Sequence, residues 1–313
     1  MVSEQDKGLS VHTKWGGKLL APMAKIPPFH GLTFAFLLGL SLVTFFFRTQ
    51  IQMWVSLLFR YGMLLVLLIV ITAFLGRRTK GRGGRLLYYF SPILFVFLIY
   101  QSLGDLIPSL HSDIDPWLIR IDFSLFGVHP TLWMERWTVP WLTDIMSIAY
   151  VSYYFLPVIL IVLLYLQQRT ADLELSLFVL IFGYYVSFVS YILFPAIGPR
   201  FTLSHLQVVP LDGSFLTDFV RDTLNTLEHN KRDCMPSGHT QIVLMVLFLT
   251  RRYERLLFYL FFPIICGLIL STIYLRYHYI VDVFAGGVFA VGCILIGPRL
   301  HEWWGRFSER PNS

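Results

Sequence analysis

The sequence predicts an all-α fold, a polytopic transmembrane helical bundle of about eight spans. Of the 313 residues, 56% are hydrophobic and only 14% are charged, and the mean hydropathy is +0.64. An average soluble domain is about 25% charged. The apolar residues gather into eight runs, most of them near the roughly 17–25 residues that a helix needs to cross a bilayer. These observations place the chain in the membrane class before any motif is considered.

The eight apolar runs define the elements in chain order. They lie near residues 31–47, 53–76, 86–103, 145–166, 175–194, 238–250, 256–275 and 280–298. The run at 238–250 is short, and we expect it to begin in a cavity open to water. The first run lacks a small-residue cleavage site, so it is expected to remain as a span. The chain then divides into an N-terminal tail (1–30), two accessory helices (31–85), a six-helix core (86–298) and a C-terminal tail (299–313).

The distribution of basic residues predicts the orientation of these spans. With eight spans, the two tails, the loops at 76–85 and 251–255, and the loop between the fourth and fifth spans fall on one side of the membrane. That side carries 16 of the 25 Lys and Arg residues, while the other carries 8 and Arg60 lies within a span. Cytoplasmic loops are enriched in Lys and Arg. Both termini are therefore expected in the cytoplasm. The same enrichment explains the net charge of +6, so no nucleic-acid partner is expected.

Two long segments, 104–144 and 195–237, would then face the extracytoplasmic side. The first carries tryptophans of the kind found at headgroup level, namely Trp117, Trp133, Trp137 and Trp141. The second contains an apolar stripe at helical spacing, formed by Phe215, Leu216, Phe219, Val220, Leu224 and Leu227. Residues 213–228 are therefore expected to form an amphipathic helix on the membrane surface. This helix is either a simple cover or a lid over a lipid entrance.

Arg200 follows the span at 175–194, in a segment where Pro195 and Pro199 stop the helix. A guanidinium offers a planar fork of donors that suits phosphate. A headgroup anchor is the alternative interpretation of a single arginine at this depth.

A stronger motif, Cys-Met-Pro-Ser-Gly-His-Thr at 234–240, opens the short span. Ser237 is a favourable N-cap, and a helix N-terminus presents free N–H groups to an anion. Gly238 would let a phosphate oxygen approach closely. His239 then lies in the first turn, where it can protonate a leaving oxygen. Cys234 is expected near this site, without a role as a nucleophile.

The third group lies between the last two spans, within residues 274–283. His278 and Asp282 are four residues apart, so they share a helical face and can touch. A carboxylate bonded to one ring nitrogen leaves the other free to attack. Arg276 adds a second guanidinium for phosphate. A structural His–Asp pair is the alternative interpretation.

Together these groups predict a phosphoryl-transfer site at one membrane face. Arginines and a helix N-terminus can hold the charge that a metal ion holds elsewhere, so no metal or other cofactor is expected. His239 and His278 also lack a third ligand at a zinc spacing. The expected partners are the bilayer and a lipid phosphate substrate, and oligomeric state is left open.

The motifs Pro236-Ser237-Gly238-His239, His278 with Asp282, and Gly198-Pro199-Arg200 resemble those of the type 2 phosphatidic acid phosphatase superfamily of lipid phosphatases and phosphotransferases. The resemblance covers residues 86–298. It implies that His278 attacks phosphorus to form a phosphohistidine, that His239 protonates the leaving group and that Asp282 orients His278.

The resemblance further implies that Arg200, Arg276, Ser237 and Gly238 bind the phosphate oxygens. Water or a second alcohol would then receive the phosphoryl group. Two family positions differ, because Leu193 replaces a Lys and Ser271-Thr272 replaces Ser-Arg. These departures and the eight-span layout are similar to the inositol phosphorylceramide synthase branch, in which a phosphorylated headgroup passes between lipids. The complete Pro-Ser-Gly-His motif resembles the phosphatases, so the acceptor stays open.

Three functions therefore compete. The first is a lipid phosphate phosphatase or phosphotransferase, and the second is a headgroup transferase that uses a lipid alcohol rather than water. The third, from another class, is a lipid transporter that uses intramembrane charge to move its substrate. A catalytically inactive scaffold is disfavoured because the two histidines and the aspartate are all present. The sequence favours the enzyme.

Overall fold

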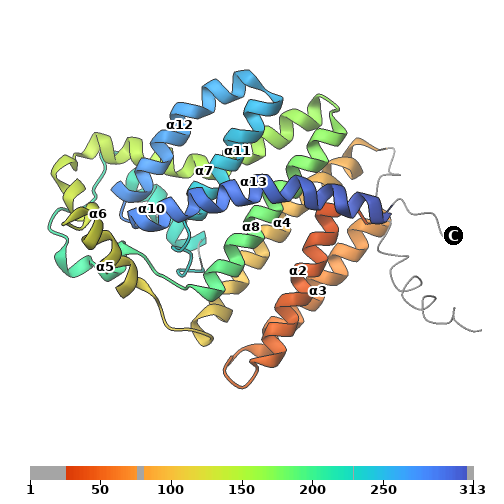
Figure 1. The fold of residues 1–313 in the computed structure, drawn as a ribbon, viewed down its shortest axis with the longest axis horizontal. Helices are drawn as coiled ribbons and strands as arrows, with labels where there is room; N and C mark the ends of the chain where they lie inside the picture. The colour runs from red at the N-terminus through yellow and green to blue at the C-terminus, as the bar shows by residue number, and fades with distance from the viewer. Residues whose placement is uncertain (1–25, 76–80, 228, 309–313) are drawn as a thin grey trace, which may run out of the picture.

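A computed structural model describes residues 26–75, 81–227 and 229–308, and within these ranges it contains helices and no strand (Figure 1). The outer parts of both predicted tails, 1–25 and 309–313, lie outside the described residues. The long helices are α2 (Pro28–Phe46), α3 (Trp54–Phe74), α4 (Arg82–Leu106), α7 (Pro140–Leu166), α8 (Thr170–Leu193), α11 (Gly238–Tyr253), α12 (Arg255–Tyr274) and α13 (Ile280–Ser308). Helix α13 continues past residue 298, so the described part of the predicted C-terminal tail is helical.

Seven of these helices are long and apolar enough to cross a membrane, and α11 is the eighth, shorter one. Its 16 residues reach about 24 Å, less than the ~30 Å of a hydrocarbon core. It nevertheless runs the depth of the bundle, because its C-terminal end meets the turn between α7 and α8. There Arg169 donates to the Tyr253 carbonyl at 3.0 Å and pairs with Glu254 at 2.9 Å. The predicted all-α polytopic bundle is confirmed.

Helix α8 lies at the centre of this bundle and packs against α2, α4, α7, α11 and α13. Its sequence is apolar on all sides, which is typical of a helix surrounded by other helices. Small residues allow close packing here: Gly183 of α8 lies against Met245 of α11, and Gly297 of α13 lies against Val179. Because α8 is held on several sides, it forms a fixed support for the helices that carry the site.

The N-terminal helices are joined to the core to different extents. Helix α2 packs directly on α8, where Phe36 stacks on Tyr185 at 4.2 Å and the Tyr185 hydroxyl bonds Thr33 at 2.9 Å. Helix α3 lies outside α2 and also packs against α4 (Figure 1). The charge of Arg60 within this span is paired with Asp105 of α4 at 2.6 Å. Pairing of this kind is what a charged group at membrane depth requires.

Short helices gather at one end of the bundle, which we call the site end. They are α5 (Asp115–Phe126), α6 (Pro130–Trp133), α9 (Pro199–Thr202) and α10 (Thr217–Leu227), with 3-10 turns between and beside them. Trp117, Trp133, Trp137 and Trp141 of this region are 41–66% exposed, as expected for side chains at headgroup level.

Helix α10 begins at Thr217, four residues later than predicted. The Asp144 carboxylate of α7 accepts the N–H groups of residues 214–217 at 2.9–3.1 Å, so these residues form the cap of the helix. The predicted apolar stripe is consequently divided. Leu224 is buried against α7 and α12 with Val220 packed beside it, whereas Phe215 and Phe219 are 92% and 72% exposed.

Candidate active site

The paired histidines meet at the site end. Nδ1 of His239, in the first turn of α11, lies 3.2 Å from Nε2 of His278, which precedes α13. On the other side of the ring, Nδ1 of His278 lies 3.2 Å from Oδ1 of Asp282, within ion-pair distance although the two atoms are not aligned as a hydrogen bond. All three side chains are buried. The geometry thus joins the second and third predicted groups into one array.

The start of α11 is shaped to hold His239 in this array. Ser237 caps the helix, as predicted, by accepting the Thr240 N–H at 3.3 Å. The N–H of Ser237 in turn donates to the backbone oxygen of Asp282 at 3.0 Å, which ties α11 to α13. Gly238 is needed because a Cβ there would clash with the Tyr191 hydroxyl of α8. Contact of Ser237 and Gly238 with phosphate stays a prediction.

A tight turn after α12 aims His278 at α11. The N–H groups of Tyr277 and His278 both donate to the carbonyl of Thr272, at 2.9 and 3.1 Å. Arg276 adopts a left-handed conformation with φ 65°, which is uncommon for a residue with a side chain. This turn reverses the chain between α12 and α13 and places the imidazole in the interior.

Asp282 is restrained by groups besides His278. Its Oδ2 accepts hydrogen bonds from the Cys234 thiol at 2.7 Å and from the Tyr279 N–H at 3.0 Å. Burial raises the pKa of the Cys234 thiol, and the adjacent Asp282 charge raises it further, so the thiol keeps its proton and acts as a donor. Ligand atoms of Cys234, His278 and Asp282 lie within 4.8 Å of one another, a spacing that could also hold a metal ion.

The pKa of His278 lies above its usual range. Burial alone would lower this pKa, because it penalises the imidazolium ion. The carboxylates of Asp282 and Asp233 outweigh burial and raise it. His278 is therefore a more basic imidazole than one in water, which favours attack on an electrophile once its proton is lost.

Two carboxylates of α5 brace the site, and neither is among the site residues predicted from the sequence. Asp115 accepts the N–H groups of Ile197 and Gly198 at 2.9 and 2.8 Å. Asp122, one heptad later and on the same side of α5, accepts the N–H groups at 280 and 281 at 2.9 Å and so caps α13. Two aspartates seven apart in an apolar, aromatic segment were the available signal.

Arg200 lies apart from the histidines. Its guanidinium donates to the Asn225 side chain at 3.2 Å and to the Tyr277 hydroxyl at 3.1 Å. Arg200 lines a cavity of about 280 Å³, which we call the arginine cavity, together with Arg221 and Arg276. The left-handed Gly198 supports this segment, since a Cβ there would lie 2.5 Å from the Tyr277 carbonyl oxygen.

Arg276 is already bonded to protein groups. It pairs with Glu135 at 3.0 Å and donates to the side chain of Gln207 at 3.0 Å and to the Val209 carbonyl at 2.6 Å. Its side chain is almost fully buried. The structure thus places this guanidinium in a bonded network, and contact of Arg276 with phosphate stays a prediction.

Two tyrosines separate the arginine cavity from the histidines. The rings of Tyr150 and Tyr277 stack at 4.5 Å, and Tyr150 also contacts the His239 ring at 4.5 Å. Tyr277 lies beneath the Arg200 guanidinium at 5.3 Å. The structure therefore brings His239, His278, Asp282, Ser237 and Gly238 together, and it places Arg200 and Arg276 in the lining of the arginine cavity.

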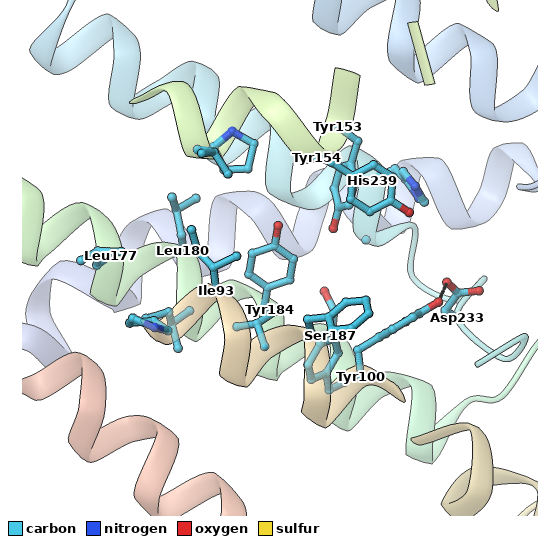
Figure 2. A pocket seen from close by; sticks show the side chains of 18 of the residues that line it. Ile93, Tyr100, Tyr153, Tyr154, Leu177, Leu180, Tyr184, Ser187, Asp233 and His239 are labelled. Atoms are coloured by element: carbon cyan, nitrogen blue, oxygen red, sulfur yellow. Dashed lines mark hydrogen bonds between the residues drawn. The ribbon is translucent and has the colours of Figure 1, made fainter. Parts of the chain in front are cut away.

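A second cavity of about 200 Å³, the apolar groove, reaches the histidines from within the bundle (Figure 2). Side chains of α4, α7 and α8 line most of its length, and His239, Gly238 and Asp233 line the end near the site. Nε2 of His239 is buried and has no hydrogen-bond partner among the described residues. The site thus has apolar space on one side and arginines on the other.

Known proteins were compared with the whole chain. It is similar to a PA-phosphatase related-family protein of Dictyostelium discoideum, with 28% identity over 177 residues. That alignment covers 50% of this chain and 32% of the relative, so the chain spans about a third of the relative's length. No solved structure matches the chain. The family model of the PAP2 superfamily matches residues 116–296, more than half of the chain and all three motifs, so the chain belongs to the PAP2 superfamily.

Proposed function

We propose that this protein cleaves or transfers the phosphoryl group, or the phosphorylated headgroup, of a lipid-linked phosphate through a phosphohistidine intermediate. The observation that carries the proposal is the buried array of His239, His278 and Asp282 at the end of the apolar groove. Membership of the PAP2 superfamily supports phosphatase-type chemistry. The seven apolar helices and the groove support a lipid as the substrate.

In the first step, Nε2 of His278 attacks phosphorus and the bond to the leaving oxygen breaks. His239 gives that oxygen a proton, and Asp282 stabilises the positive charge on the His278 ring. In the second step, an acceptor hydroxyl loses its proton to His239 and displaces His278 from phosphorus. Because only 3.2 Å separates the two imidazole nitrogens, the rings must move apart when the phosphoryl group enters.

The phosphate oxygens would bind the N–H groups at the start of α11, near Ser237 and Gly238, where the helix dipole favours an anion. Arg200 would join them by turning away from the Tyr277 hydroxyl. Arg276, given its bonds to Glu135 and Gln207, acts in this proposal by holding the neighbouring loop, with only its remaining N–H groups for phosphate. The chemistry is proposed to need no metal ion, and the site is proposed to face the extracytoplasmic side.

The identity of the acceptor divides the two enzyme hypotheses. A phosphatase passes the phosphoryl group to water, whereas an enzyme like inositol phosphorylceramide synthase passes a phosphorylated headgroup to a lipid alcohol. Purified full-length protein given a panel of labelled lipid phosphates separates them. Free phosphate indicates a hydrolase, and a new phospholipid formed only with an added lipid alcohol indicates a transferase.

The nucleophile is tested by His278→Ala. Loss of the attacking nitrogen should lower turnover by about a thousandfold or more. A quenched reaction of the parent protein with a ³²P-labelled lipid phosphate should leave an acid-sensitive, base-stable label, as expected for phosphohistidine. This label should be absent from His278→Ala. His111→Ala removes an exposed histidine and should leave both readouts unchanged. Turnover near the wild-type rate in His278→Ala would contradict the proposed enzyme mechanism.

A further inference from the structure

The end of the apolar groove carries a pair of polar residues that the proposed mechanism does not use. Asp233, three residues before the Pro236-Ser237 motif, accepts a hydrogen bond from the Tyr100 hydroxyl of α4 at 2.7 Å. Both residues line the groove, together with His239 (Figure 2). A carboxyl group in apolar surroundings loses free energy unless it is hydrogen-bonded. Burial raises the pKa of Asp233, and the bond from Tyr100 opposes that rise.

The two cavities beside the site carry charges of opposite sign. None of the described residues that line the apolar groove is Lys or Arg, and its charged group is the carboxyl of Asp233. The arginine cavity has the opposite character, because Arg200, Arg221 and Arg276 line it. An ionised Asp233 would therefore repel a phosphate group, whereas the three arginines would attract it to the arginine cavity. An uncharged hydroxyl would find an acceptor beside Asp233.

The groove is also open to the flank of the bundle. Ile93 and Phe97 of α4 and Tyr154 of α7 line it and are still 41–44% exposed. From this opening the lining continues along α8, past Leu180 and Tyr184, to Asp233 and His239 (Figure 2). An apolar chain can therefore enter sideways from the hydrocarbon layer and lie with its polar end beside the histidines.

We infer that Asp233 and Tyr100 form a binding site for the hydroxyl group of a long-chain lipid alcohol whose chain fills the apolar groove. The inference rests on the proposed function and adds to it a specific subsite for the alcohol. The Asp233 carboxylate accepts a hydrogen bond from the hydroxyl group of the alcohol and holds its oxygen near His239. Asp233 therefore acts as a specificity-determining residue.

The same subsite would serve the second step of transfer and the first step of hydrolysis. In transfer, the hydroxyl oxygen forms the new bond to phosphorus and its proton passes to His239. The phosphorus–nitrogen bond to His278 breaks, and its electron pair returns to the imidazole ring. In hydrolysis, the lipid alcohol is the leaving product, which occupies the subsite until it returns to the membrane.

The inference is tested by binding, which does not require turnover. Full-length protein in detergent is photolabelled with hexadecanol that carries a diazirine, and in parallel with the chain-matched alkane that lacks the hydroxyl. Asp233→Asn keeps the shape of the side chain and should weaken binding of the alcohol about tenfold, because a hydrogen bond to a charged group is lost. Binding of the alkane should change by less than about twofold, within the effect of a single uncharged hydrogen bond.

The controls separate this inference from the proposed function. Asp212→Asn removes an exposed carboxylate at the site end and should leave binding of both probes unchanged. Tyr100→Phe should weaken binding of the alcohol and leave binding of the alkane unchanged. His278→Ala should bind the alcohol normally although it is inactive, so failure of the catalytic proposal would not alter this readout. Equal weakening of alcohol and alkane by Asp233→Asn, or no weakening of either, would overturn the inference.

Discussion

At the scale of single residues, Asp282 links His278, the proposed nucleophile, to the thiol of Cys234. The carboxylate faces His278 with one oxygen and receives the thiol and the Tyr279 N–H on the other. Each of these donors limits rotation of the Asp282 carboxylate about its Cβ–Cγ bond. The orientation of His278 therefore depends in part on the Cys234 thiol, which acts on the ring through Asp282.

Cys234 is accordingly predicted to be a positioning residue. Cys234→Ala removes a hydrogen bond to a charged group, worth ~1.5–3 kcal/mol, and should lower kcat about tenfold or more with little change in KM. Cys234→Ser keeps a donor and should restore most of the activity. Steady-state kinetics of the purified variants provides the measurement, with Cys266→Ala, at an exposed position on α12, as the control. Equal activity of the Ala and Ser variants would argue against this role.

The raised pKa of His278 predicts the acid side of the pH profile. Only the neutral ring can attack phosphorus, so kcat/KM should fall as the pH decreases through this pKa, which lies above the usual range of a histidine. Asp282→Asn removes the nearest charge that favours the imidazolium ion, and the midpoint should then move to lower pH. The residual activity of Asp282→Asn suffices for this measurement, because the midpoint of the pH profile is compared and not the maximal rate. A midpoint that stays in place in Asp282→Asn would contradict the assignment.

At the scale of elements, the motifs at 234–240 and 274–283 were predictable because each lies within a few residues of chain. Their chemistry and the cap at Ser237 follow from local spacing. The supports of the site could not be predicted, because Asp115 and Asp122 bond backbone groups more than 80 residues away. The bonds of Arg276 could not be predicted for the same reason, because Glu135 and Gln207 reach it from separate segments.

Helix α10 is predicted to depend on Asp144. The carboxylate caps its first turn, and loss of such a cap destabilises the start of a helix. Asp144→Ala should therefore speed amide hydrogen exchange across residues 213–227 while α8 and α11 keep their protection. Asp222→Ala, on the exposed side of the same helix, should leave exchange unchanged. If α10 acts as a lid rather than a cover, KM for the lipid will change in Asp144→Ala as well.

At the scale of the whole molecule, the described turns separate into two ends. The histidines and the short helices occupy the site end, and the contact of Arg169 with Glu254 lies at the other. The bias of Lys and Arg predicts that this other end faces the cytoplasm. Assignment of the two ends to the two sides of a membrane is a property of the chain as a whole and needs its own test.

Accessibility of introduced cysteines provides that test. Lys231→Cys lies at the site end and Arg252→Cys at the opposite end, and both positions are exposed. In sealed right-side-out vesicles, a membrane-impermeant maleimide should label the first variant at once and the second only after permeabilisation. The parent protein gives the background from its own three cysteines. The reverse pattern would place the site in the cytoplasm.

The short length of α11 affects the lipid around the protein. A helix that reaches about 24 Å beside longer neighbours leaves a hydrophobic mismatch, which a bilayer accommodates by thinning locally. Its N-terminus, with Ser237 and His239, then lies deeper than the headgroups of an undistorted leaflet. Thinning at this point would lower the phosphates of nearby lipids toward the histidines. The membrane itself would thereby become part of the path of the proposed substrate, and its thickness would help to determine in which bilayers the proposed reaction proceeds.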